Sequence, residues 1–161
     1  MRIFGRVVIT ALCVAGLIGA GAIPTFADEK GNLTDFSSMT AISVGGMVVR
    51  GIPGGGVPWA ITSGTGTVSQ QGAVDVTVKG LVIPSIGGIN PIAGFEATVS
   101  CLTPDGVVNV STGRFDASVP GGNSHITATV DLPRPCKDPI VFVGIFPSGR
   151  WFAMSNPDAQ P

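Results

Sequence analysis

Apolar and polar residues alternate along three stretches of the chain. Residues 73–79, 95–101 and 124–132 place every second side chain, mostly Val, Ile, Ala or Phe, on one face. A period of two residues is typical of a β-strand with one buried face. In the third stretch the inward side chains are Ile126, Ala128, Val130 and Leu132, and the outward ones are His125, Thr127, Thr129 and Asp131. The pattern predicts three half-buried strands.

A continuous apolar run, residues 140–146, lies between Pro139 and Pro147. A run without polar positions indicates a central strand that is covered on both faces. Pro147-Ser148-Gly149 has the composition of a turn, and residues 151–154 form a second apolar segment after it. These two segments are predicted to pair as a hairpin.

Gly, Val, Thr, Ser, Ile and Pro dominate the rest of the chain, and no window has apolar residues at helical spacing. Weaker strand candidates are residues 47–50, 59–63, 65–69, 107–112 and 115–119. Eight or nine short strands separated by turns predict an all-β fold, a single antiparallel β-sandwich of immunoglobulin-like architecture. A small β-barrel is the alternative.

The first 27 residues have the composition of a signal peptide. Two arginines precede an apolar stretch, residues 7–23, and a Thr-x-Ala triplet ends at Ala27 before three charged residues. This order predicts export by a Sec-type signal peptide and cleavage after Ala27. An uncleaved membrane anchor is the alternative, but the apolar stretch is short of the roughly 20 residues that a membrane span prefers. We expect a secreted, extracellular protein that is not inserted in a membrane after cleavage.

Cleavage would leave 134 of the 161 residues, the size of one domain. Residues 28–45 are expected to be a flexible leader, residues 46–155 the β-sandwich domain and residues 156–161 a flexible tail. Seven basic and ten acidic residues would remain, a formal charge of −3. This balance does not favour binding to nucleic acid.

Cysteine usage agrees with an oxidising compartment. Cys13 would leave with the signal peptide, and Cys101 and Cys136 would remain as an even pair. We predict a disulfide between them, joining either neighbouring or facing strands. The sequence leaves that choice open.

The single histidine limits the chemistry that the chain can perform. His125 would need Ser124 or Ser118, with Asp131 or Asp116, to form a hydrolase triad, yet alternation places it on a solvent-facing side. Alternation likewise places Glu96 and Asp75 outward, away from a cleft that paired carboxylates require. We predict no catalytic residue, no metal site and no cofactor.

Two local features are candidates for ligand contact. Trp59 and Trp151 are the only tryptophans, and core or sheet-edge packing is the favoured interpretation for both. The run Gly51-Ile52-Pro53-Gly54-Gly55-Gly56-Val57-Pro58 is followed by a strand pattern instead of a helix, which favours a wide turn over a phosphate cradle. A binding loop, with the two tryptophans beside it, is the alternative.

From Val57 onward the chain resembles small exported bacterial proteins of unassigned function. The resemblance covers about two thirds of the chain and rests on residues 57–61, 78–83, 97–101, 131–136, 139–143 and 149–153, which are strand and turn patterns. It implies an exported bacterial β-domain and supplies no mechanism.

Three classes of function follow. The leading one is a non-catalytic extracellular domain acting by surface contact, in an envelope, matrix or partner-binding role. The second is a module that binds a carbohydrate or another small ligand through Trp59 and Trp151. The third is a hydrolase with an unrecognised site around His125 and Asp131. If the Val-rich strands leave a flat, unpaired sheet edge, self-association by strand addition is expected, whereas proline or charge at the edges would favour a monomer. The sequence leaves this choice open.

Overall fold

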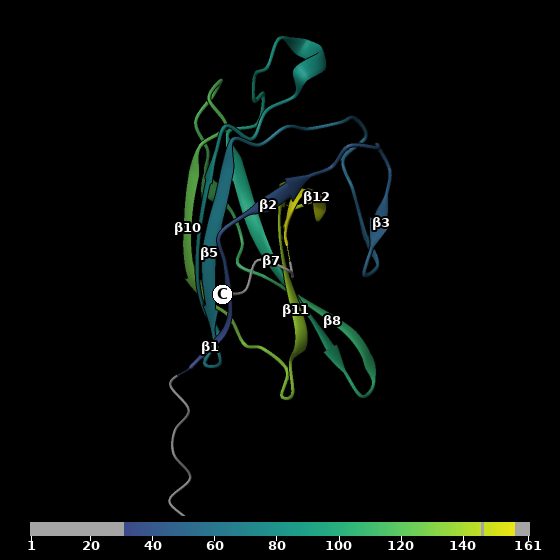
Figure 1. Cartoon of the computed structure of the whole chain (residues 1–161), viewed down its shortest axis with the longest axis vertical. Helices are drawn as coiled ribbons and strands as arrows, with labels where there is room; N and C mark the ends of the chain where they lie inside the picture. The colour runs from purple at the N-terminus through teal and green to yellow at the C-terminus, as the bar shows by residue number, and fades with distance from the viewer. Residues whose placement is uncertain (1–30, 146, 157–161) are drawn as a thin grey trace, which may run out of the picture.

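The computed structural model describes residues 31–145 and 147–156, which form two antiparallel β-sheets packed face to face (Figure 1). A third, two-stranded hairpin lies beyond the second sheet. The described residues contain a single 3₁₀ turn, η1 (Pro84–Ile86), and no α-helix. The predicted all-β sandwich is therefore confirmed, with twelve strands in the described residues where eight or nine were expected.

The first sheet contains two of the three alternating strands. Its order is β1 (Asn32–Phe36), β5 (Ser63–Ser69), β6 (Ala73–Lys79) and β10 (Ser124–Thr129). Val74, Val76 and Val78 are buried against the second sheet, and Ile126 lies opposite Val76 in the register of β10 and β6. The outward side chains of β10 are exposed, as the alternation predicted.

The second sheet is built around a strand that is buried on both faces. Its order is β2 (Met39–Ala41), β12 (Arg150–Ser155), β11 (Lys137–Ile145), β7 (Gly94–Thr103) and β8 (Gly106–Ser111). The short strand β9 (Phe115–Asp116) pairs with the first two residues of β7, which β8 does not reach. Val141, Phe142 and Val143 of β11 are almost fully buried. β11 and β12 form the predicted hairpin, and Gly149 adopts a positive φ of 66° in its turn.

Two of the weaker strand candidates are largely irregular. Residues 59–62 lie outside the named strands and make one isolated bridge, between Ala60 and Val82. Of residues 115–119, only the first two form a strand, β9. The remaining small hairpin consists of β3 (Val48–Val49) and β4 (Ile52–Pro53).

The segment expected to be a flexible leader, residues 28–45, contributes two strands. β1 pairs with β5 in the first sheet, and β2 pairs with β12 in the second. Phe36 and Met39 are buried in the core between them. The expectation of a flexible leader was wrong for residues 32–41. Few apolar side chains alternate there, so the sequence shows no strand pattern. Residues 28–30 lie outside the described residues.

The two chain ends that were expected to be cleaved or flexible are largely outside the described residues. This applies to the signal peptide, residues 1–27, and to residues 157–161 of the tail. Asn156 is described and is bound to Ser38 and Thr40, where β1 gives way to β2. Its amide oxygen accepts a hydrogen bond from Thr40 Oγ1 at 2.6 Å, and its Nδ2 donates to Ser38 Oγ at 3.0 Å.

Glu96 differs from its predicted position on a solvent-facing side. Only 4% of its surface is exposed, and Ser111 Oγ donates a hydrogen bond of 2.5 Å to Glu96 Oε2. Alternation correctly places Glu96 on the opposite face from Phe95 and Ala97. The outer face of β7 is covered, however, so that facing away from the sandwich core does not mean facing solvent.

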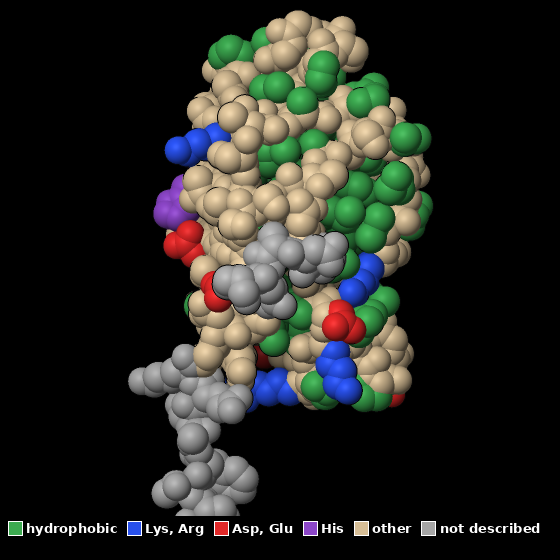
Figure 2. All heavy atoms as spheres, viewed as in Figure 1, with side chains coloured by type: hydrophobic (Ala, Val, Ile, Leu, Met, Phe, Trp, Pro, Cys, Tyr) green, Lys and Arg blue, Asp and Glu red, His purple; other side chains and the backbone are tan. Residues whose placement is uncertain are grey.

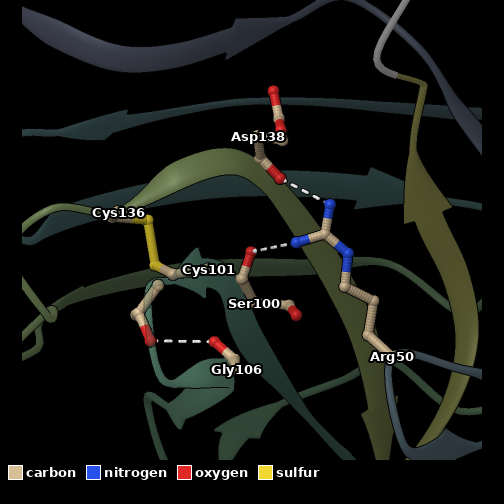
Figure 3. The surroundings of a disulfide bond; sticks show 7 residues. Arg50, Ser100, Cys101, Gly106, Cys136 and Asp138 are labelled. Carbon is tan, nitrogen blue, oxygen red and sulfur yellow. Dashed lines mark hydrogen bonds between the residues drawn. A yellow bond between two sulfur atoms is a disulfide. The ribbon is translucent and has the colours of Figure 1, made fainter.

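The predicted disulfide between Cys101 and Cys136 is present (Figure 3). Cys101 lies in β7, and Cys136 directly precedes β11, the strand that pairs with β7. The bond therefore joins neighbouring strands of one sheet and not the two facing sheets. It closes the end of β7 and β11 that also receives the side chain of Arg50.

Candidate functional site

The outer face of the second sheet carries a loop, residues 43–58, which we call the covering loop. It leaves and returns to the sheet at one point, where Ile42 N–H donates to Phe152 O and Trp59 N–H donates to Ile42 O, both at 2.8 Å. Within the loop, Gly46 N–H donates to Gly55 O at 2.9 Å, and Gly54 N–H donates to Met47 O at 2.7 Å. These bonds extend the β3–β4 hairpin down to the neck of the loop.

The tip of the covering loop is a two-residue turn. Val49 pairs with Ile52, and Arg50 and Gly51 between them both have positive φ, 50° and 78°. Two successive positive φ values define a type I′ turn, which suits a tight hairpin because its twist matches that of the strands. Glycine adopts this conformation without strain, whereas arginine at the first position does so only when other contacts hold it.

Those contacts come from the arginine itself (Figure 3). Arg50 Nη2 donates to Asp138 O at 2.8 Å, and Nη1 lies 3.5 Å from Ser100 O, so the guanidinium binds backbone carbonyls of β11 and β7. Asn109 Nδ2 of β8 donates to Arg50 O at 3.0 Å. Three strands of the second sheet thus hold one residue at the loop tip.

The base of the covering loop lies against β12. Gly54 makes a parallel bridge with Trp151, Gly55 N–H donates to Trp151 O at 2.9 Å, and Arg150 Nη1 donates to Gly54 O at 3.1 Å. A Cβ at Gly54 would collide with the side chain of Ile42, and one at Gly55 would lie 2.9 Å from the Phe152 ring. Glycine is needed here for close packing on the sheet, in agreement with the turn interpretation of this run.

Four apolar side chains of the covering loop point to solvent. Val44 and Val48 are 61% and 62% exposed, and Met47 and Val57 are each 41% exposed. Apolar side chains gather on the side of the molecule where β3 lies (Figure 2). The only charged side chain among residues 43–58 is Arg50, and its guanidinium is bound to the sheet. The loop therefore presents an apolar, uncharged surface on a fixed backbone.

The two tryptophans proposed as ligand contacts lie beneath this surface. Trp59 is 6% exposed and stacks on Phe152 with ring centroids 4.0 Å apart, and Trp151 is 2% exposed with its ring 5.7 Å from that of Phe142. Both have the core packing that the sequence favoured. Neither presents an aromatic face to solvent, which a ligand platform would need.

His125 lies on the open outer face of the first sheet. Its Nε2 is 3.1 Å from Asp75 Oδ1, and both side chains are about three-fifths exposed, 60% and 59%. Asp116, Ser124 and His125 line one shallow depression of about 560 Å³. Ser124 Oγ donates to Asp116 O at 2.8 Å, and Ser118 Oγ accepts from Asn123 N–H at 2.9 Å. Neither serine hydroxyl contacts the imidazole, so the residues of the considered triad are neighbours without triad geometry.

The same outer face carries hydroxyl and carboxylate groups in rows. Asp35, Thr67 and Asp75 are directly opposite one another on β1, β5 and β6. They line a second depression, of about 670 Å³, together with Thr65 and Phe36. This arrangement offers hydrogen-bonding groups to a polar ligand without an exposed aromatic ring.

Among the described residues, no group of three or more His, Cys, Asp or Glu side chains is placed to hold a metal ion. Within the same residues, no helix has the length and apolar character needed to cross a membrane.

Sequence reasoning identified the glycine-rich run as the most unusual local feature but missed how it is anchored. Arg50 gives no sequence signal for its role, because its partners are backbone carbonyls that are distant along the chain. Comparison with known proteins adds no assignment: no family model, no curated protein and no solved structure matches the chain.

Proposed function

We propose that the protein is a secreted, non-catalytic β-domain that acts by contact of its covering loop with a protein partner in the cell envelope or matrix. The observation that carries this proposal is the exposure of Val44, Met47, Val48 and Val57 on a loop whose backbone is bound to the sheet at its neck, base and tip. Contiguous exposed apolar surface in a soluble domain marks a site of interaction.

The anchoring of the loop supports a binding role over a merely tolerated apolar surface. A loop held by Arg50 and by the Gly55–Trp151 hydrogen bond loses little conformational freedom when a partner binds, which lowers the entropic cost of association. The centres of protein interfaces are depleted in charged residues. The covering loop has this composition, since its one charge is turned toward the sheet.

Location outside the cytoplasm is part of the proposal. The predicted signal peptide and the resemblance to exported bacterial proteins support it, as does the Cys101–Cys136 disulfide, because such bonds persist in oxidising compartments. A partner is then to be sought on the surface of the producing cell.

A polysaccharide partner is the second candidate. The row of Asp35, Thr67 and Asp75 favours it, because carboxylates and hydroxyls bind the hydroxyl groups of sugars. It uses the outer face of the first sheet and not the covering loop. The two candidates therefore predict different effects of substitution.

The test is the distribution of the protein between medium and washed cells of the organism that encodes it. Val44→Asp/Val48→Asp places two charges on the covering loop, and Val119→Asp, at an exposed valine outside the loop, is the matched control. We expect the wild type and Val119→Asp to remain with the cells and Val44→Asp/Val48→Asp to move to the medium. Protease treatment of the cells before addition of purified protein should abolish rebinding.

Two outcomes would overturn the proposal. A wild-type protein found entirely in the medium would show no envelope partner. Binding that survives Val44→Asp/Val48→Asp and protease treatment of the cells but is lost in Asp75→Ala would transfer the site to the first sheet and favour the polysaccharide.

A further inference from the structure

β8 is an edge strand whose outer side is unpaired in the part of the chain that the structure describes. It pairs with β7 alone, from Thr98 opposite Ser111 to Thr103 opposite Gly106. In Figure 1, β8 diverges from β11 at the lower end of the molecule, away from the first sheet. Its edge is therefore accessible.

The register shows which backbone groups of β8 are available. Thr112 N–H donates to Ala97 O at 2.9 Å, so Val110 and Val108, two and four residues earlier, also direct their backbone groups toward β7. The intervening residues Val107, Asn109 and Ser111 direct their N–H and C=O groups away from β7. They form a row of donors and acceptors along the edge.

This edge lacks the features by which proteins usually prevent strand addition. Such features are short length, bulges, proline and charge. β8 has six residues, without proline or charge, and Val107 and Val108 are 45% and 37% exposed. By contrast, β1 has a register irregularity between Asn32 and Thr34, β2 has three residues, and the start of β10 is bound to β9 through Ser124 Oγ and Asp116 O.

We propose that two copies of this chain associate by antiparallel addition of β8 to β8. Only residues with outward backbone groups can form the new hydrogen-bonded pairs, and the symmetric arrangement places Asn109 opposite its own copy and Val107 opposite Ser111. On the face toward the sandwich core, Val108 of one copy is then opposite Val110 of the other. Cross-strand pairs of β-branched residues stabilise antiparallel sheets.

Charge at the two ends of β8 supports a second copy as the occupant and favours the antiparallel direction. Asp105 precedes the strand and is exposed. Arg114 follows the strand and is 47% exposed, and its guanidinium binds Asp116 Oδ1 at 3.1 Å and Ala93 O at 2.7 Å within the same chain. In the antiparallel arrangement, Asp105 of one copy is opposite Gly113 of the other, next to Arg114. A parallel arrangement would bring the two Asp105 carboxylates to the same end of the strand pair, whereas Arg114 at the other end is already paired with Asp116. The two sheets would join into one continuous sheet with both disulfides near the junction.

The test is the molar mass of protein purified from cells that express the full chain, measured by sedimentation over a wide range of concentration. The wild type should reach twice the monomer mass. Val107→Pro removes an outward N–H without removing a hydrogen bond to β7, and Val108→Lys places a charge in the valine pair, so both should give the monomer mass. Val119→Lys is the control for added charge and should remain dimeric.

A cysteine at the symmetry axis tests the register. Asn109→Cys should form a disulfide-linked dimer under oxidising conditions, whereas Val119→Cys should not. A wild type that is monomeric at every concentration would overturn the inference, as would a dimer that persists in both Val107→Pro and Val108→Lys. If Val44→Asp/Val48→Asp dissociates the dimer and Val107→Pro does not, the self-contact belongs to the covering loop. Envelope binding is read separately, so this inference and the proposed function can fail independently.

Discussion

Arg50 has a backbone conformation, φ 50°, that residues with a Cβ seldom adopt, and the reason is its side chain. The guanidinium reaches Asp138 O while the backbone carbonyl accepts from Asn109 Nδ2. Asparagine is well suited to the first position of a type I′ turn but is too short to reach β11. Position 50 therefore combines local backbone strain with a long-range hydrogen bond. A substitution that relieves the strain but cannot form the bond separates the two effects.

We expect Arg50→Asn to change the free energy of unfolding by no more than about 1 kcal/mol, because relief of turn strain offsets the lost hydrogen bonds. The covering loop should nevertheless open more often. Hydrogen exchange of Gly46 and Gly54, whose amides bond within the loop, should become faster, as measured by mass spectrometry of peptides from residues 43–58. Arg134→Asn, at an exposed arginine, should leave this exchange unchanged. Unchanged exchange in Arg50→Asn would show that the arginine does not hold the loop.

Alternation predicted the burial of single side chains correctly where one face of a strand packs in the core and the other faces solvent. It failed where both faces of the strand are covered. Val74, Val76 and Ile126 are buried as their alternation indicated. Glu96 obeys the same alternation but is buried, because the outer face of the second sheet is covered. Its carboxylate accepts a hydrogen bond from Ser111 of β8, a contact that no local pattern identifies.

At the scale of elements, the long alternating strands were evident from sequence and the short ones at the sheet edges were not. β6, β7 and β10 each bury a row of apolar side chains, which gives a period of two, and β11 is evident as a continuous apolar run. β1 and β2 bury few residues each, and their pairing is decided by strands that come much later in the chain. Tertiary pairing, not local preference, makes them strands.

The two strands in the former leader give a direct test of whether that segment is part of the domain. Phe36 is 5% exposed, and a Cβ at Gly66 would lie 2.7 Å from its ring, so it fills a tight space in the core. Phe36→Ala should lower the free energy of unfolding by about 3 to 5 kcal/mol, measured by urea denaturation. Val44→Ala, at an exposed position in the same segment, should have little effect. A stability of Phe36→Ala equal to that of the wild type would mean that residues 32–41 do not contribute to the fold in solution.

At the scale of the whole molecule, the sequence established the sandwich and the cysteine pair but not which surfaces are available to partners. Strand count and turn composition limit the topology, and an even number of cysteines outside the predicted signal peptide limits the pairing. The covering loop and the β8 edge depend on the order of strands in the second sheet, in which β8 follows β7 at one edge and residues 54–55 meet β12, which lies next to the other edge strand, β2. That order is a property of the assembled fold.

The disulfide connects these two surfaces, because it closes the end of β7 and β11 where Arg50 is bound and where β8 begins. Its sequence separation is 35 residues, for which the chain-entropy model gives about 3 to 4 kcal/mol of stabilisation. Reduction of the purified protein should therefore lower the midpoint of urea denaturation, and in Cys101→Ala/Cys136→Ala the reductant should have no further effect. Intact mass should show a chain that begins at Asp28, is two hydrogens lighter than the dithiol and resists alkylation before reduction. A chain that begins at Met1 with alkylatable thiols would contradict export and the disulfide together. If reduction of the disulfide leaves the midpoint of urea denaturation unchanged, sheet pairing alone holds β7 against β11.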